Sequence, residues 1–146
     1  MNFEPQIQMY RHDPENGIYG DCLRAAVAMC LGMPAADVPH FCQGESDDGV
    51  WRTRLHAWLV PQGLYALEVP WPDLALLLQQ AKYSFHHAAI TVSGRSPRGT
   101  LHECVIYRGK LYDPHPDGGG LVAPHEDGYY WSQIFTKRLR VQDRAA

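Results

Sequence analysis

Residues 20–31 read GDCLRAAVAMCL, and this stretch decides the fold of the N-terminal half of the chain. From Cys22 onward it consists almost entirely of strong helix formers. Gly32 and Pro34 follow, a pair that is typical of a helix end, and Asp21 stands where an N-cap residue is expected. The stretch therefore predicts a helix that begins with this cysteine and ends before Gly32.

Outward from this helix, the pattern of apolar residues predicts further helices and then strands. Helical spacing and Pro or Gly at the ends indicate helices over 35–41, 48–60 and 72–81. Runs rich in β-formers indicate strands over 64–69, 87–92, 101–107, 110–113 and 137–141. Helices first and strands after them are the order of an α+β domain. We expect a single domain over 1–146, with the N-terminal helices packed on one side of an antiparallel β-sheet.

The composition limits the classes of partner. The chain has 146 residues, of which 45% are hydrophobic, and a net charge of −3. It can therefore bury a core, but it has no excess of positive charge. It contains neither a long basic run nor an apolar stretch that could span a bilayer. Neither a nucleic-acid nor a membrane partner is expected, and nothing in the sequence implies a cofactor.

The cysteines and the N-terminal residues together indicate a cellular compartment. Cysteines stand at positions 22, 30, 42 and 104. The first residues lack the basic and then apolar pattern of a signal peptide. Because the reducing cytosol keeps thiols free, we expect a cytoplasmic location and four free cysteines rather than two disulfides.

Cys22 is the first residue with the chemistry of a nucleophile. A thiol reacts as the thiolate, and the unpaired N–H groups at a helix start can lower its pKa. Gly20 allows the backbone to turn and a substrate to approach closely. Asp21 opposes the thiolate unless its side chain caps the helix. A buried structural thiol is the other interpretation of a cysteine at this position.

Residues 102–113, HECVIYRGKLYD, predict a β-hairpin with Arg108-Gly109 as its two-residue turn. In this register Cys104 lies opposite Asp113, so His102 and Asp113 share one face of the sheet as diagonal neighbours. The aspartate can then accept a hydrogen bond from one imidazole nitrogen and leave the other for the thiol. A slip of one residue would separate the pair and leave an ordinary surface histidine and aspartate.

Cys22, His102 and Asp113 together have the parts of a thiol nucleophile, its base and the acid that orients the base. Acyl transfer also needs hydrogen-bond donors for the developing oxyanion. The backbone N–H of the cysteine is one candidate. The side-chain candidates are Asn16 and Gln8, both upstream in the sequence.

The other histidines and cysteines form no familiar ligand spacing, and we expect no metal. The metal-binding alternative is a zinc site assembled from four scattered residues: His40, Cys42, Cys30 and Cys104. His115 also competes with the aspartate as the group that orients the catalytic histidine. A carboxylate is favoured because it stabilises an imidazolium better.

These motifs resemble a known family. The run GDCLRAAVAM at 20–29, the Ser-Pro-Arg-Gly that precedes His102, and the Asp-Pro-His-Pro that begins at Asp113 are similar to small papain-like cysteine peptidase homologues of phages and prophages. The resemblance extends over residues 19–121 in the same order. It departs at Glu103, where relatives commonly have alanine.

The resemblance implies a papain-like cysteine peptidase core with Cys22 as nucleophile, His102 as general base and acid, and Asp113 as the orienting group. It implies a hydrolase of the thiol protease type, namely a peptidase, isopeptidase or amidase. Its substrate would be a peptide or protein in the cytoplasm of a phage-infected or lysogenic bacterial host. The alternative is a catalytically inactive papain-like module that binds a host or phage protein.

Overall fold

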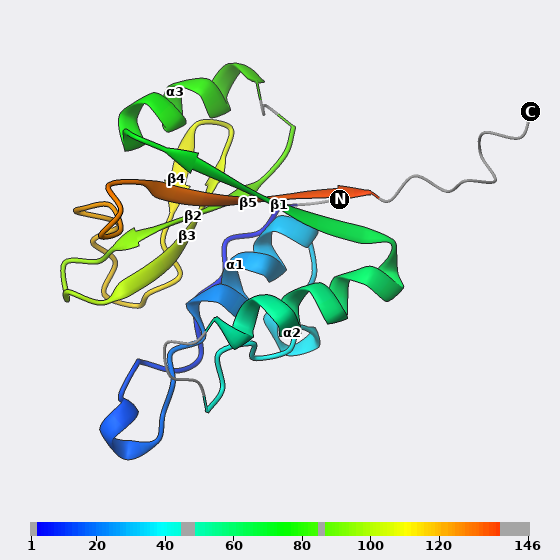
Figure 1. Cartoon of the computed structure of the whole chain (residues 1–146), viewed down its shortest axis with the longest axis vertical. Helices are drawn as coiled ribbons and strands as arrows, with labels where there is room; N and C mark the ends of the chain where they lie inside the picture. The colour runs from blue at the N-terminus through cyan, green and yellow to red at the C-terminus, as the bar shows by residue number, and fades with distance from the viewer. Residues whose placement is uncertain (1–2, 45–48, 85–86, 138–146) are drawn as a thin grey trace, which may run out of the picture.

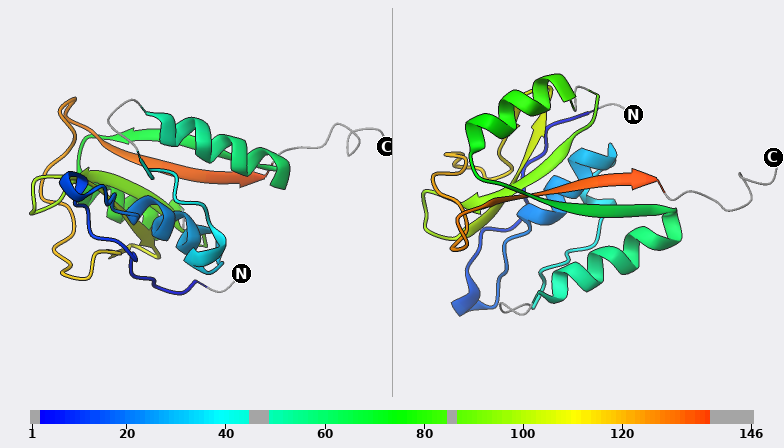
Figure 2. Two further views of the ribbon diagram at one scale, coloured as in Figure 1. Left: turned by 90° about the horizontal axis from the view of Figure 1, so that it is seen from below. Right: turned by 45° about the horizontal axis from the view of Figure 1, so that its top comes forward.

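A computed structural model describes residues 3–44, 49–84 and 87–137 of the chain. Helices lie on both faces of a single β-sheet (Figure 1, Figure 2). The α-helices are α1 (Cys22–Leu31), α2 (Val50–Leu59) and α3 (Leu74–Ser84), and the short 3-10 helices are η1 (Pro14–Asn16), η2 (Ala35–Asp37) and η3 (Val60–Gln62). The strands are β1 (Leu64–Trp71), β2 (Ile90–Arg95), β3 (Leu101–Tyr107), β4 (Lys110–Tyr112) and β5 (Tyr130–Lys137).

Across the described residues the strands form a five-stranded sheet in the order β1-β5-β2-β3-β4. All of the neighbouring strands are antiparallel, which confirms the predicted α+β class. The last strand in sequence, β5, lies between β1 and β2 and was not predicted. The strand expected over 137–141 falls largely outside the described residues, of which Lys137 ends β5.

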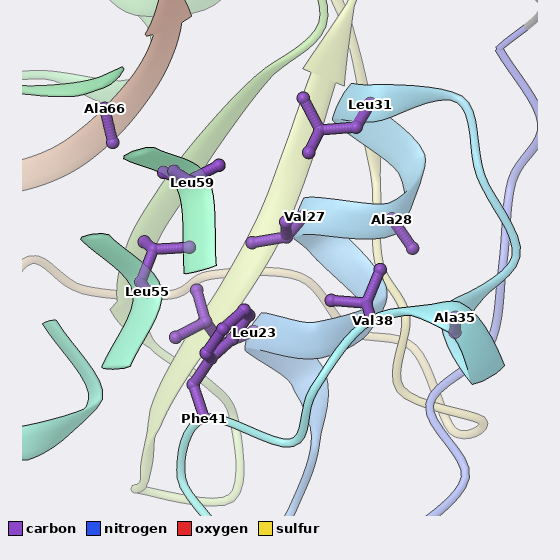
Figure 3. Packing of buried hydrophobic residues seen from close by; sticks show 10 residues of the cluster. All are labelled: Leu23, Val27, Ala28, Leu31, Ala35, Val38, Phe41, Leu55, Leu59 and Ala66. Atoms are coloured by element: carbon purple, nitrogen blue, oxygen red, sulfur yellow. The ribbon is translucent and has the colours of Figure 1, made fainter. Parts of the chain in front are cut away.

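The helices occupy two layers: the N-terminal helices α1 and α2 share one side of the sheet, as expected, but α3 covers the other side (Figure 1). α1 and α2 lie below the sheet in Figure 1, and α3 lies above it. Leu23 and Val27 of α1 meet Leu55 and Leu59 of α2 in the lower core, with Phe41 beside them (Figure 3). The upper core joins α3 to β2 and β3 through Leu77, Ala81, Ile90, Val92, Cys104 and Ile106. α2 precedes β1 in sequence and α3 follows it, and the apolar patterns of the two helices do not say which face of the sheet each one covers.

Helix α1 spans the predicted residues and ends at Gly32, which has the left-handed φ of 67° that favours glycine. Asp21 precedes the helix but makes no side-chain capping hydrogen bond, contrary to the prediction. Its Oδ1 instead accepts a hydrogen bond from the backbone N–H of Tyr10 at 2.8 Å. Its Oδ2 lies 3.5 Å from the Arg24 guanidinium. This aspartate therefore ties the N-terminal segment to the start of α1.

The other predicted elements differ from the structure at their ends. The helix expected over 35–41 is only the short η2, and the one expected over 48–60 begins at Val50, with residue 48 outside the described part. The helix expected over 72–81 begins two residues late, where Asp73 Oδ1 accepts from the N–H of Leu76 at 2.9 Å. The strand expected over 87–92 begins at Ile90. Within the described ranges, no helix has the length and apolar character needed to cross a membrane.

Candidate functional site

The hairpin formed by β3 and β4 has the predicted register. Tyr107 pairs with Lys110 and Val105 pairs with Tyr112 across the turn. Arg108 has φ 53° and the following glycine φ 78°, as a two-residue turn of this type requires. One step further along this register, Cys104 and Asp113 are opposite each other, just beyond the end of β4.

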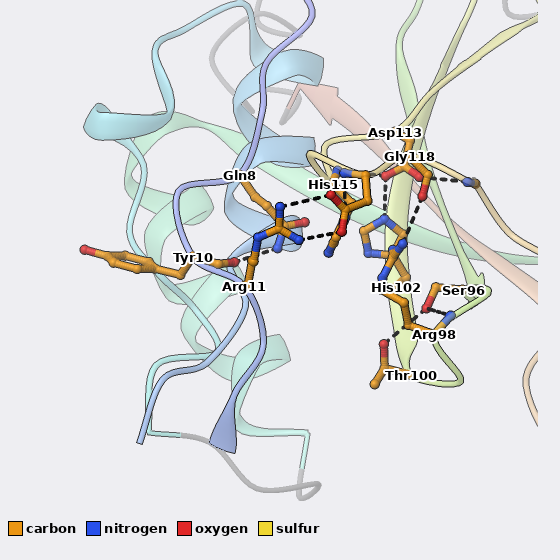
Figure 4. A network of polar contacts seen from close by, with 12 residues as sticks. Gln8, Tyr10, Arg11, Ser96, Arg98, Thr100, His102, Asp113, His115 and Gly118 are labelled. Atoms are coloured by element: carbon orange, nitrogen blue, oxygen red, sulfur yellow. Dashed lines mark hydrogen bonds and ion pairs between the residues drawn. The ribbon is translucent and has the colours of Figure 1, made fainter. Parts of the chain in front are cut away.

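His102 and Asp113 form the centre of the site (Figure 4). The imidazole Nε2 lies 2.6 Å from Asp113 Oδ1. An ionised carboxylate only accepts hydrogen bonds, so Nε2 is the nitrogen that donates and Nδ1 is the one that can take up a proton. The imidazole is 5% exposed, which shields the pair from competing water.

Two backbone amides hold the Asp113 carboxylate in place. Oδ1 also accepts from the N–H of His115 at 2.8 Å, and Oδ2 accepts from the N–H of Gly120 at 2.8 Å. Burial opposes the charge, but the hydrogen bonds from His102 and from these amides outweigh it and lower the pKa of Asp113 to about 2. The carboxylate is therefore ionised and rigidly placed near neutral pH.

His115 does not occupy the position that Asp113 fills. Its ring packs edge-on to that of His102, with the two centroids 6.0 Å apart. Its Nδ1 accepts a hydrogen bond from the N–H of Asp117 at 3.0 Å, and burial, followed by the nearby Arg98, lowers its pKa. A neutral imidazole with its Nδ1 engaged in this way supports the loop. Of the two candidates, Asp113 is the one that is hydrogen-bonded to the His102 imidazole.

Cys22 begins α1, as predicted, and is partly exposed. Its thiol lies beside the backbone of Glu103, the residue after His102. Burial raises the pKa of Cys22 to about 12, although the backbone amides of Glu103 and Leu23 favour the thiolate. The lowering that a helix start can produce is therefore not seen here, because burial desolvates the thiol more than the backbone amides stabilise the anion.

Cys22 and His102 belong to opposite layers of the fold. Side chains alternate along β3, so His102 shares the face of Cys104, which packs under α3. Val105, on the other face, packs on Ala26 of α1. Cys22 reaches β3 from this second face, close to the start of the strand. Among the described residues, no hydrogen bond joins its thiol to His102.

Cys104 is the thiol that the structure brings to the His–Asp pair. Donor atoms of His102, Cys104 and Asp113 all lie within 4.8 Å of one another, and these three residues could hold a metal ion. Cys104 is fully buried, and burial raises its pKa. It is therefore poorly suited to attack a substrate. The zinc set considered from the sequence is not assembled, since in the described ranges only Cys104 of its members enters such a group. None of the four cysteines, which all lie in the described ranges, forms a disulfide.

Gln8 and Asn16 are placed very differently. The backbone N–H of Gln8 donates to Pro114 O at 2.8 Å, and its buried side chain lies against Gly20, where an added Cβ would be 3.4 Å from Nε2. Nε2 donates to Tyr10 O at 2.6 Å. Asn16 is exposed in η1, and its amide donates to the Asp13 carboxylate at 2.7 Å. Of the two oxyanion candidates, only Gln8 contacts both the segment just before Cys22, at Gly20, and the loop after Asp113, at Pro114.

Glu103 is a functional candidate that the sequence analysis did not single out as such. It lies on the α1 face of β3, opposite Ser93 of β2. Burial raises its pKa to about 8, although a hydrogen bond from the Thr91 side chain lowers it. Its charge would in turn raise the pKa of Cys22. A lone carboxyl within an apolar strand was the signal that could have found it.

Comparison with known proteins does not place the chain in a family. No family model matches it, and neither a curated protein nor a solved structure matches it.

Proposed function

We propose that this protein is a thiol-dependent acyl-transfer enzyme, a peptidase, isopeptidase or amidase built on a papain-like core. Cys22 is the nucleophile, His102 the general base and acid, and Asp113 the orienting group. The observation that carries the proposal is the 2.6 Å bond from His102 Nε2 to a carboxylate fixed by two backbone amides. Such a bond sets the tautomer and leaves Nδ1 as the base.

The raised pKa of Cys22 determines how the first step must run. The resting thiol is protonated near neutral pH. The proposed first step therefore requires a shift, on substrate binding, that brings Cys22 Sγ within hydrogen-bond reach of His102 Nδ1, which accepts the proton as attack begins. The sulfur then bonds to the carbonyl carbon of a peptide or amide, and the carbonyl π electrons move to the oxygen. Asp113 stabilises the imidazolium that forms.

We place the developing oxyanion at the N-terminus of α1, beside Cys22. The backbone N–H of Cys22 and the side-chain amide of Gln8 are the donors that we assign to it. The tetrahedral intermediate collapses when the imidazolium gives its proton to the leaving amine, which breaks the C–N bond. Water, or another amine, then attacks the acyl-enzyme with the neutral imidazole as base and regenerates the thiol.

A catalytically inactive binding module is the second candidate. The protonated thiol and the absence of a Cys22–His102 hydrogen bond within the described ranges favour it. A metal-binding protein is a third candidate, favoured by the group of His102, Cys104 and Asp113. Origin in a phage or prophage, and action inside its host cell, stay predictions from the sequence resemblance.

The test is alkylation of each cysteine by iodoacetamide from pH 5 to 10, followed residue by residue with mass spectrometry. The variants are His102→Ala and, as the matched control, His115→Ala, which removes the neighbouring buried imidazole. We expect Cys22 to react faster than Cys30 near neutral pH, and to lose at least about tenfold of that rate only without His102.

Two results would redirect the assignment. Reaction of Cys22 at the rate of the other thiols, with no response to His102→Ala, would contradict the enzyme and favour the binding module. One equivalent of zinc in the purified protein, lost in Cys104→Ala, would favour the metal-binding protein instead.

A further inference from the structure

Arg98 is an exposed residue on a rigid loop that leads directly into the site. The loop joins β2 to β3 and is closed by a hydrogen bond from Ser96 N to Thr100 O at 2.9 Å. The buried Ser96 hydroxyl lies 3.2 Å from the Thr100 hydroxyl and accepts from the N–H of Arg98 at 3.2 Å. The backbone of Arg98 is thus fixed four residues before His102.

The Arg98 side chain spans the site to the opposite loop (Figure 4). Its Nη1 donates to Gly118 O at 2.9 Å, two residues before the Gly120 amide that holds Asp113. Pro97 strengthens the contact between the loops, since its ring leaves only 2.7 Å for a Cβ at Gly119. The guanidinium is therefore held beside the His–Asp pair, and a substrate would not have to order it.

The charges around Arg98 leave it without a carboxylate partner among the described residues. Arg11 and Asp117, on the same side of the site, form a bidentate pair with bonds of 2.5 and 3.0 Å. Asp113 is engaged with His102. Arg98 is near enough to Asp117 to help lower the pKa of that carboxyl, but within the described ranges no carboxylate forms an ion pair with its guanidinium. In the described part of the chain, Gly118 O is the acceptor that its guanidinium binds, which leaves most of its five N–H donors for a planar, bidentate acceptor.

We propose that Arg98 binds a carboxylate of the substrate, and that the preferred substrates are acidic peptides or amides with a carboxylate next to the bond that is cleaved. This inference rests on the proposed function for the position of that bond. A guanidinium that is already in place matches a carboxylate with two parallel hydrogen bonds. Arg98 is then a specificity residue, separate from the groups that move protons.

The experiment compares two reagents of nearly the same shape, neutral iodoacetamide and anionic iodoacetate. Both alkylate Cys22 by forming a C–S bond and expelling iodide. The readout is the ratio of the iodoacetate rate to the iodoacetamide rate at Cys22, divided by the same ratio for the protein unfolded in urea. For wild type we expect this normalised ratio to be about ten, because the free energy of a hydrogen bond to a charged group corresponds to a rate preference of about that size.

Arg98→Gln should return the ratio to about one. Arg11→Gln is the matched control, because it removes the same charge nearby but from a residue already paired with Asp117. We expect it to keep most of the preference. Equal losses in both variants would mean a diffuse field rather than a binding contact, and a ratio of one in wild type would overturn the inference.

A second measurement does not depend on the thiol. Cys22→Ser protein is titrated with N-acetylglutamate and, separately, with N-acetylglutamine, while the ring resonances of His102 and His115 are followed by NMR. Saturable shifts with the acid alone, abolished by Arg98→Gln, would support the inference even if Cys22 proves inert and the enzyme assignment fails. Identical responses to the two compounds would refute it even if the alkylation test supports the enzyme.

Discussion

Replacing Asp113 by asparagine tests how much the charge and the hydrogen bonds of this carboxylate stabilise the folded protein. Asparagine can keep Oδ1 as the acceptor for His102 Nε2 and for the N–H of His115. Its Nδ2 then takes the place of Oδ2 and directs an N–H at the N–H of Gly120, which donates to that oxygen in the wild type. The variant therefore loses the charge and creates an unsatisfied donor in a site that is nearly closed to solvent.

The size of the effect follows from the pKa of Asp113. It is about 2 in the folded protein against an ordinary 3.8, and a difference of one in pKa corresponds to about 1.4 kcal/mol. With an allowance for partial solvent screening, we expect Asp113→Asn to lower the free energy of unfolding by roughly 1–2 kcal/mol at pH 7. Because the pKa of Asp113 is lower in the folded protein, the carboxylate stabilises the fold at pH values above its pKa in the unfolded chain. This contribution is lost as the pH falls from about 4 toward 2.

The assay is urea unfolding, followed by circular dichroism at a series of pH values from 7 down to 3. The difference between wild type and Asp113→Asn should be largest at pH 7 and shrink below pH 4. Asp117→Asn is the control, since it removes a carboxylate that is exposed and paired with Arg11, and its effect on the free energy of unfolding should be small at every pH. Equal stability of wild type and Asp113→Asn at pH 7, or a difference that does not change with pH, would refute the reasoning.

Three further predictions concern other residues of the site and the core. Burial raises the pKa of Glu103 to about 8 from an ordinary 4.5, so wild type loses stability as the pH rises through this range. In urea unfolding, the free energy of unfolding of Glu103→Gln should rise relative to that of wild type by on the order of 3 kcal/mol between pH 5 and pH 9. A difference between the two proteins that stays constant with pH would contradict this. Gln8→Ala should slow acylation of Cys22 by p-nitrophenyl acetate by roughly 10²-fold, as loss of an oxyanion donor does, while Asn16→Ala should leave the rate unchanged. Equal losses of rate in the two variants would show that Gln8 is not an oxyanion donor. Phe41 is 1% exposed in the lower core, so Phe41→Ala should cost about 3–5 kcal/mol in the same unfolding assay, and a cost below about 1 kcal/mol would mean that this core is not packed as described.

Features that depend on nearby residues could be predicted from the sequence. Helix α1 follows from a run of strong helix formers that ends in glycine and proline. The hairpin register follows from Arg108-Gly109, because a two-residue turn leaves a single pairing for the strands on either side. The His102–Asp113 pair is a consequence of that register alone, which is why it was the best-predicted part of the site.

Features that depend on contacts between distant segments could not be predicted. The Gln8 amide is placed by a backbone bond to Pro114, and no local pattern encodes that contact. The pKa of Cys22 depends on how closely β3 covers the thiol, so the helix start alone gives the wrong direction. The face of the sheet that α3 covers is likewise a result of the whole fold.

The central place of β5 in the sheet has a consequence for the order in which the chain can fold. β2, β3 and β4 are neighbours in sequence as well as in the sheet, so they can pair as soon as residues up to Tyr112 are available. Among the strands that the structure describes, β1 pairs only with β5, which follows the other four in sequence, and must wait for it. Since closing a long loop is slow compared with forming a hairpin, we expect the His102–Asp113 pair to form early in refolding. The lower core around α1 and α2 would close late, after β5 has entered between β1 and β2.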